Sequence, residues 1–137
     1  MKVVLDTNVL VSALLKSNGI PARILRAAWD GNLELLLSAA MREELAAVLE
    51  YPKIRRRLAA AGVHAALFLE LLPFFTTTVA VGEVTVPKPR DSDDWTVLAT
   101  FVAGGADWLI SGDNDLLVLK DQFPILTPSA FAERFLV

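Results

Sequence analysis

The alternation of short apolar runs with longer amphipathic segments is the feature that most constrains how this chain folds. Apolar and often β-branched runs lie at residues 2–5, 33–37, 76–81, 106–111 and 125–126, and segments with a helical pattern separate them. Strands that are apolar throughout are typical of parallel sheets covered on both faces. Because crossovers between such strands are right-handed, helices lie on both sides of the sheet. The sequence therefore predicts an α/β fold, a three-layer α/β/α sandwich around a parallel sheet of about five strands.

Local markers set the expected helix boundaries. Pro21 opens a helix that runs through Trp29 to a stop at Gly31, and Ser38 is the expected N-cap of a helix through Leu49. A short helix is predicted over residues 116–119, and further helices over 63–75 and from Pro128 to Phe135. No linker or internal repeat divides the chain, so a single domain is expected over residues 1–137.

Composition excludes several classes of protein. The chain has no cysteine, which excludes disulfide frameworks, zinc–thiolate sites and thiol catalysis. The formal net charge of −3 gives no overall basic field for binding nucleic acid, so the positions of the acids matter more than their number. The first residues do not resemble a signal peptide, and no stretch reaches the ~18 apolar residues of a membrane helix. A soluble cytoplasmic protein with no membrane partner is the expectation.

Four acidic residues follow the predicted strands in the positions where ligands bind. Asp6 ends the first strand, and Asp113 lies two residues beyond the end of the fourth. Glu44 lies on the helix after the second strand, and Asp94 lies in the first turn of the helix before the fourth. Ligands of open parallel sheets bind beyond the carboxyl ends of the strands, so we expect these four carboxylates at one edge of the sheet.

A crowd of carboxylates indicates a hard cation. Two like charges ~4 Å apart repel by roughly 4 kcal/mol at an effective dielectric constant of about 20, unless they share protons or bind a metal. Oxygen ligands without His or Cys favour Mg²⁺ or Mn²⁺, and Mg²⁺ commonly meets phosphate oxygens. The only histidine is His64, and phosphate-binding glycine motifs are absent. A metal that acidifies a bound water supplies the missing base, which points to a phosphodiester or phosphoryl substrate.

Four segments carry a resemblance to a known family. They are Val-Leu-Asp-Thr-Asn-Val-Leu-Val-Ser at 4–12, Arg-Glu-Glu-Leu at 42–45, Arg-Asp-Ser-Asp-Asp at 90–94, and Gly-Gly-Ala-Asp-Trp-Leu-Ile-Ser-Gly-Asp-Asn-Asp-Leu-Leu at 104–117. In this order they resemble the PIN-domain family, and most closely the VapC-like toxin components of prokaryotic toxin–antitoxin pairs. The resemblance extends from Val3 to Phe131.

The resemblance implies a metal-dependent ribonuclease with one or two divalent ions, a homodimer, and a cognate antitoxin that blocks the site. It assigns the catalytic and metal-binding acids as Asp6, Glu44, Asp94 and Asp113. The supporting polar residues are Asn8 and Ser111, and Asp115 is a candidate fifth acid. One departure is Trp95, because this group commonly has Asn after the third acid.

Each acid also has a simpler interpretation. Asp6 suits the cap of the following helix, Asp94 suits a capping box, and Asp113 suits a turn. Glu43 is the alternative to Glu44 as the second acid, and Asp93 is the alternative to Asp94 as a metal ligand. The candidate RNA-binding cations, which also suit a solvated surface, are Arg55, Arg56, Lys88 and Arg90.

Two other functions remain open at this point. The Leu-Asp-Thr-Asn segment superficially resembles haloacid-dehalogenase phosphatases, although Asn8 stands where such a phosphatase needs a second Asp. A receiver-type phosphotransfer domain belongs to the same alternative, although Lys120 is poorly placed for the late lysine that such a domain needs. A non-catalytic PIN-like binding module is the other alternative, and the full set of acids argues against it.

Overall fold

A computed structural model of the chain describes residues 1–87 and 92–136. Its strands form one five-stranded sheet in the order β3-β2-β1-β4-β5, and every pair of neighbouring strands is parallel. The elements are β1 (Lys2–Leu5), α1 (Thr7–Leu15), α2 (Ile20–Trp29), β2 (Glu34–Ser38), α3 (Ala39–Leu49), α4 (Pro52–Ala60), α5 (Ala65–Phe75), β3 (Thr76–Val79), α6 (Ser92–Gly104), β4 (Trp108–Ile110), α7 (Asn114–Leu117), β5 (Ile125–Leu126) and α8 (Pro128–Phe135).

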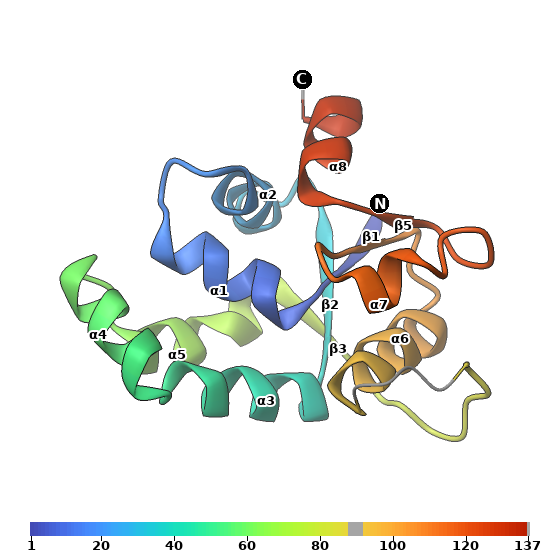
Figure 1. The fold of residues 1–137 in the computed structure, drawn as a ribbon, viewed down its shortest axis with the longest axis horizontal. Coiled ribbons are helices and arrows are strands. Elements are labelled where there is room, and N and C mark those ends of the chain that lie inside the picture. The colour runs from blue at the N-terminus through green and yellow to red at the C-terminus, as the bar shows by residue number, and fades with distance from the viewer. Residues whose placement is uncertain (88–91, 137) are drawn as a thin grey trace.

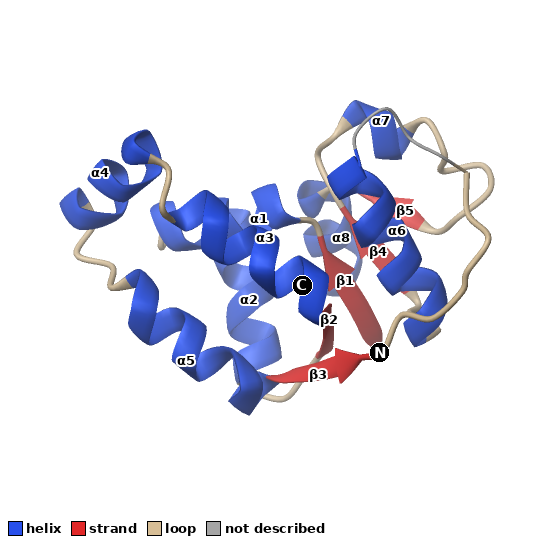
Figure 2. Ribbon diagram, turned by 90° about the horizontal axis from the view of Figure 1, so that it is seen from below, coloured by secondary structure: helices blue, strands red, loops and turns tan. Residues whose placement is uncertain are grey.

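The helices cover both faces of the sheet, which confirms the predicted α/β/α fold. Figure 1 shows α1 and α2 on one side of the strands and α6 on the other, and the view from below in Figure 2 agrees. This division follows from the strand order. The chain moves from β1 outward to β2 and β3, and then returns through α6 to β4 on the other side of β1.

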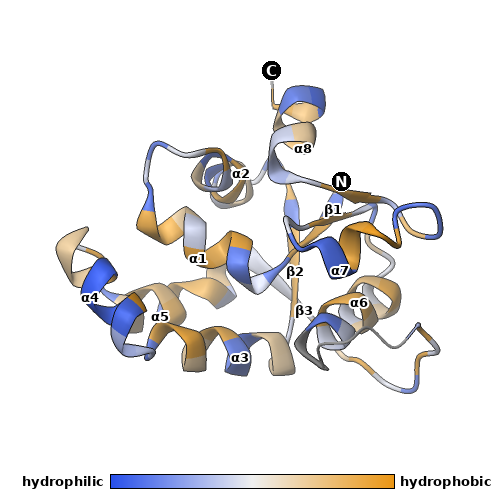
Figure 3. Ribbon diagram, in the orientation of Figure 1, coloured by the Kyte–Doolittle hydropathy of each residue, from blue (hydrophilic) through white to orange (hydrophobic). Residues whose placement is uncertain are grey.

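The central strands are buried because helices cover them on both faces. Val3, Val4 and Leu5 of β1 are fully buried, as are Leu109 and Ile110 of β4. Figure 3 shows β1 and most of β2 as hydrophobic and the threonine-rich β3 as paler, whereas the segments that begin α1, α6 and α7 are hydrophilic. The apolar interior thus ends at the carboxyl edge of the sheet, and polar side chains begin there.

Local markers at the helix ends behave largely as expected. The Ser38 hydroxyl caps α3 by accepting a hydrogen bond from the backbone N–H of Met41 at 3.3 Å. Gly31 and Gly62 have φ of 82° and 71°, the left-handed conformation that ends α2 and α4. The helix predicted over residues 63–75 begins two residues later, at Ala65.

The helix predicted over residues 116–119 was wrong by two residues, since α7 spans Asn114–Leu117. The physical reason is that Asp113 caps this helix. Its Oδ1 accepts a hydrogen bond from the backbone N–H of Asp115 at 2.9 Å, so the helix starts directly after Asp113.

In the described part of the chain, no single helix is long and apolar enough to cross a membrane. The helix pair Pro52–Ala60 and Ala65–Phe75 passes that test only in combination, and the two helices meet at an angle of 85°.

Candidate metal centre

The register between β1 and β4 places two of the predicted acids side by side. Leu5 pairs with Ile110, and the backbone N–H of Asp6 donates to the carbonyl oxygen of Ile110 at 3.0 Å. The next residue after Ile110 is Ser111, and Asp113 follows two positions later. β2 and β3 are added on one side of β1, and β4 and β5 on the other. The point between β1 and β4, where the strand order reverses, is the switch point at which open parallel sheets bind ligands.

A third acid reaches the same point from the opposite face of the sheet. Asp94 lies in the first turn of α6, which packs against β1 and β4. One carboxylate oxygen each of Asp6, Asp94 and Asp113 lies within 4.8 Å of the others. Asp6 and Asp94 are both only 4% exposed, whereas Asp113 is half-buried and opens the cluster to solvent. Three acids separated by up to 107 positions in the sequence therefore meet at one edge of the sheet.

Ser111 connects two members of this cluster. Its hydroxyl donates to Oδ2 of Asp6 at 2.7 Å, and its oxygen accepts the backbone N–H of Asp113 at 3.0 Å. Ser111 is fully buried, so water does not compete for either bond. Ser111 thus links Asp6 and Asp113 through two short hydrogen bonds, and its supporting role at the site stays a prediction.

The position of Asp6 makes its charged form unfavourable in the absence of a cation. Burial raises the pKa of the Asp6 carboxyl, and the negative charge of Asp113 raises it further. The Ser111 hydroxyl and the nearby backbone amides of Asn8 and Thr7 oppose this rise but do not cancel it. Although Asp6 occupies the N-cap position of α1, its side chain makes no capping hydrogen bond, so capping alone does not explain its burial.

Two further predicted acids lie outside this three-carboxylate group within the described residues. Glu44 is half-buried on α3, and its Oε2 atom is inaccessible to solvent, whereas the neighbouring Glu43 is exposed. Asp115 is half-buried on α7, and its backbone N–H is the group that Asp113 caps. The side chain of Asp93 lies outside the described part of the structure.

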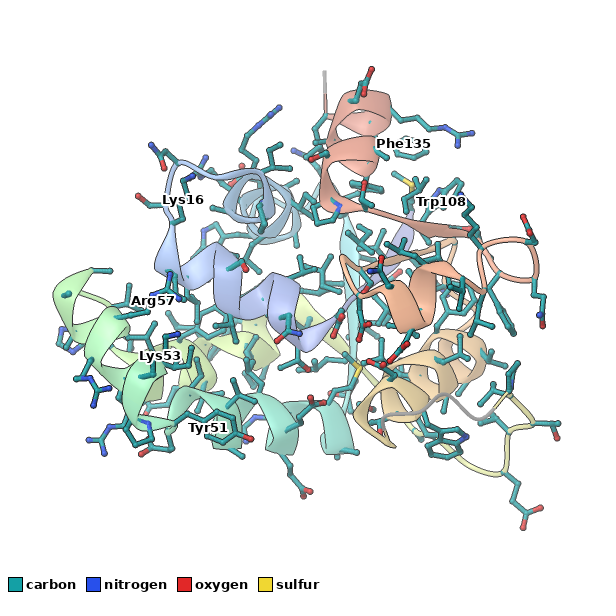
Figure 4. The ribbon with its side chains drawn as sticks, viewed as in Figure 1. Lys16, Tyr51, Lys53, Arg57, Trp108 and Phe135 are labelled. Atoms are coloured by element: carbon teal, nitrogen blue, oxygen red, sulfur yellow. The ribbon has the colours of Figure 1, made fainter. Side chains whose placement is uncertain are left out.

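The predicted RNA-binding cations divide into two sets. Arg55 and Arg56 are exposed on α4, and Arg55 pairs with Glu50 at 3.7 Å on the surface. Figure 4 shows Lys53 and Arg57 on the same helix and Lys16 beyond the end of α1 that is far from Asp6. Lys88 and Arg90 lie outside the described residues.

An open groove of about 670 Å³ adjoins the acid cluster on the side of α1 and α7. Its polar lining includes Asn8 and Ser12 from α1 and Asp113, Asn114 and Asp115 from the start of α7. The Asn8 side chain is exposed in this groove, while its backbone amide lies near Asp6. A polar ligand that occupies this groove therefore has direct access to Asp113.

The donor set at this edge fits a divalent metal ion. Asp6, Asp94 and Asp113 offer only oxygen ligands, which suits Mg²⁺ or Mn²⁺. Thr7 gives a second observation, because its Oγ1 is inaccessible to solvent and has no hydrogen-bond partner in residues 1–87 and 92–136. Because buried polar groups are normally hydrogen-bonded, a bound water or ion would satisfy this hydroxyl. No sequence pattern marks Thr7 as a site residue, apart from its place directly after Asp6.

The fold and this cluster together define the class of protein. An acidic cluster at the switch point of a parallel sheet, with oxygen donors only and an open polar groove, is suited to metal-assisted chemistry on a phosphate ester. Residues 2–115 match the family model described as "PIN domain". The chain belongs to the PIN-domain family, whose members are generally metal-dependent nucleases.

A curated relative aligns with nearly the full length of the chain. It is an uncharacterised protein, MJ1680, of Methanocaldococcus jannaschii, 31% identical over 146 aligned residues that include 98% of this chain and 92% of the relative. No solved structure matches the chain significantly.

Proposed function

We propose that this protein is a ribonuclease that hydrolyses RNA phosphodiester bonds with Mg²⁺ or Mn²⁺, and that residues 1–137 act as one PIN-like domain. The observation that carries the proposal is the convergence of Asp6, Asp94 and Asp113 at the switch point of the sheet. Membership of a family of nucleases supports the reaction class. When bound, the ion supplies Lewis acidity to a phosphate oxygen and makes a neighbouring water more acidic.

The residues of the cluster have different tasks in this proposal. Asp6 is the buried ligand whose orientation the Ser111 hydroxyl fixes, and Asp94 closes the site from the other face of the sheet. Asp113 is half-buried and lines the groove, so it is the ligand next to the substrate. Asn8 lines the same groove and is placed to donate hydrogen bonds to the substrate. Asp115 lines the groove without joining the cluster, and we propose a supporting role for it.

Glu44 is proposed as the fourth acid, acting on a water that is bound at the site. This role is supported by its half-buried position on α3, a helix that contacts both α1 and α6. The substitution Glu44→Gln is expected to lower kcat/KM by 10- to 100-fold, as is common for residues that hold a metal ligand in place. Glu43→Gln, at the exposed neighbouring position, is the matched control and should leave kcat/KM unchanged. Equal effects of the two substitutions would refute the role of Glu44.

The cations of α4 are proposed to contact the RNA backbone. Figure 1 shows α4 beside the end of α1 that is far from the acids, and the nine residues of α1 span about 14 Å. A single strand that crosses the acid cluster and follows α1 then reaches Arg55 and Arg56, and we propose Lys88 and Arg90 as further contacts. Substituting Arg56 by Gln should weaken RNA binding and reduce its dependence on salt.

Cleavage of a fluorogenic single-stranded RNA in MnCl₂ tests the reaction itself. Wild-type protein is expected to cleave this RNA and to lose activity in EDTA, whereas Asp6→Asn is expected to be inactive. Asp121→Asn removes one exposed carboxylate elsewhere and is the matched control. Intact RNA with wild-type protein, or identical cleavage by Asp6→Asn, would contradict the proposal. A DNA strand of the same sequence tests whether the substrate is RNA.

We further propose that the protein is the toxin of a type II toxin–antitoxin pair, that it forms a homodimer and that it acts on cytoplasmic RNA. The support is the resemblance of its four acidic segments to VapC-like toxins. Induced expression of the wild-type chain in a bacterial host is expected to stop growth, whereas Asp6→Asn should permit it. Unaffected growth with an active ribonuclease would reject the toxin role while leaving the nuclease assignment in place. Light scattering after gel filtration measures the oligomeric state.

A further inference from the structure

A second pocket lies on the same edge of the sheet as the acids, and the proposed cleavage reaction does not use it. It has a volume of about 500 Å³. Its walls come from four elements: Ser38 at the end of β2, Ala39 and Ala40 of α3, Val79 and Val81 at and beyond the end of β3, and Trp95 and Ala99 of α6. The described residues that line it carry no charge, and most of its surface is apolar. This size falls in the range of pockets that bind small molecules.

The pocket adjoins the acid cluster through the first turn of α6. Asp94 belongs to the cluster and Trp95 lines the pocket, and their Cα atoms are about 3.8 Å apart as consecutive residues. Figure 1 shows the beginnings of α3 and α6 close together, and the two helices are in contact. Neighbouring strands lie about 4.8 Å apart, so β3 is roughly 10 Å from β1 along the same edge.

The lining of this pocket distinguishes between the parts of a polynucleotide. A phosphate group needs a cation or several N–H donors, and the described residues of this apolar wall include no cation. A base is planar, neutral and aromatic, and the large indole ring of Trp95, which is 36% exposed, offers a face for stacking. β3, whose Thr78 and Val79 line the pocket, is an edge strand of the sheet.

We propose that this pocket binds one base of the RNA whose backbone crosses the acid cluster, and that Trp95 stacks on that base. The inference rests on the proposed ribonuclease function and adds to it a residue that selects where the strand is held. Trp95 is also the position at which this chain departs from its family resemblance. Substrate preference at this nucleotide is therefore expected to be a property of this chain.

Fluorescence of Trp95 tests the contact without altering it. Trp29→Phe and Trp108→Phe leave Trp95 as the only tryptophan of the three, and Asp113→Asn prevents cleavage. The probes are ten-nucleotide oligouridine and oligoadenine strands and an abasic ribose-phosphate strand of equal length, and anisotropy of a terminal label measures their binding separately. The base-bearing strands are expected to quench Trp95 emission and the abasic strand is not.

The outcomes separate the two proposals. Binding of oligouridine and oligoadenine without any change in Trp95 emission would overturn the base pocket and leave the ribonuclease in place. Equal quenching by the abasic strand would also overturn it, because the indole would then sense the backbone. If no strand binds and the wild-type protein cleaves no RNA, both proposals fail together.

Steady-state kinetics provide a second test in the active protein. Removal of one stacking contact weakens nucleic-acid binding by roughly 5- to 150-fold, so Trp95→Ala should raise KM by that factor with little change in kcat. Trp95→Phe keeps an aromatic ring and should recover most of the loss. The control is Trp29→Ala, which removes an exposed indole from α2. A fall in kcat with KM unchanged would show that Trp95 acts through Asp94, which would refute the base pocket.

Discussion

Replacing Asp6 by Asn is expected to stabilise the fold while it abolishes activity. The three carboxylates have oxygens within 4.8 Å of one another, and two unit charges at that distance repel by about 3.5 kcal/mol at an effective dielectric constant of about 20. Asp6→Asn removes two of the three repelling pairs. Its amide oxygen still accepts the hydrogen bond from Ser111, at a loss of about 1 kcal/mol relative to the charged acceptor.

The net gain is smaller than the two Coulomb terms together. Solvent screens the half-buried Asp113, and the raised pKa of Asp6 already relieves part of the repulsion. We therefore expect Asp6→Asn to raise the free energy of unfolding by about 1–3 kcal/mol in EDTA near pH 7. A ligand at 100 times its Kd stabilises a protein by about 2.7 kcal/mol, so saturating MnCl₂ should stabilise the wild type and not the variant.

Urea denaturation of both proteins, in EDTA and in MnCl₂, measures these differences in the free energy of unfolding. Asp121→Asn controls for the loss of one negative charge from an already acidic chain and should change stability by less than about 0.5 kcal/mol. An Asp6→Asn protein that is no more stable than wild type in EDTA would refute the reasoning. So would equal stabilisation of the two proteins by Mn²⁺.

Three further predictions concern the same elements. Ser111→Ala leaves Oδ2 of Asp6 and the backbone N–H of Asp113 without their buried hydrogen-bond partner. Metal affinity measured by calorimetry should therefore fall 10- to 100-fold, and unchanged affinity would contradict the supporting role of Ser111. Gly104→Ala places a methyl group 2.6 Å from Cδ1 of the buried Leu36. Thermal denaturation should show that the free energy of unfolding falls by about 1–3 kcal/mol, partly offset by ~1 kcal/mol from the higher helix propensity of Ala. Gly82→Ala, with open space around it, is the control, and equal stability of the two variants would contradict the predicted clash. The raised pKa of Asp6 means that the folded state holds the proton of this carboxyl more tightly than the unfolded state. In EDTA, the contribution of Asp6 to stability is therefore present below its unfolded pKa of about 3.8 and is lost as pH rises through the folded pKa, and metal affinity should rise over the same interval. A wild-type stability in EDTA that increases with pH relative to Asp6→Asn would contradict this prediction.

Much of the fold could be predicted because local patterns and long-range packing agree. The apolar run before Asp6 forms β1, and Ser38 caps α3 through its side chain as predicted. The third strand was predicted to continue to Val81 but pairs only as far as Val79, opposite Ser38. Its β-branched sequence continues, but β2 has ended, so no partner remains for a longer strand.

The site was predictable from topology but not in its details. Asp6 and Asp113 lie beyond the ends of β1 and β4, and Asp94 lies in the first turn of α6, which begins at the same edge of the sheet. Their convergence therefore follows from the strand order. The place of Glu44 outside that group depends on the rotation and position of α3, which its helical pattern does not fix. The burial of Thr7 likewise depends on how α1 packs, which no local pattern specifies.

Anomalous diffraction from crystals grown with MnCl₂ tests the central claim most directly, because it locates the ion without reference to activity. We expect a strong peak between Asp6, Asp94 and Asp113, with carboxylate oxygens at about 2.0–2.2 Å from the ion. The peak should be absent from crystals of Asp6→Asn grown in the same way. A fully occupied Mn²⁺ at another place, or none near these three aspartates, would contradict the account.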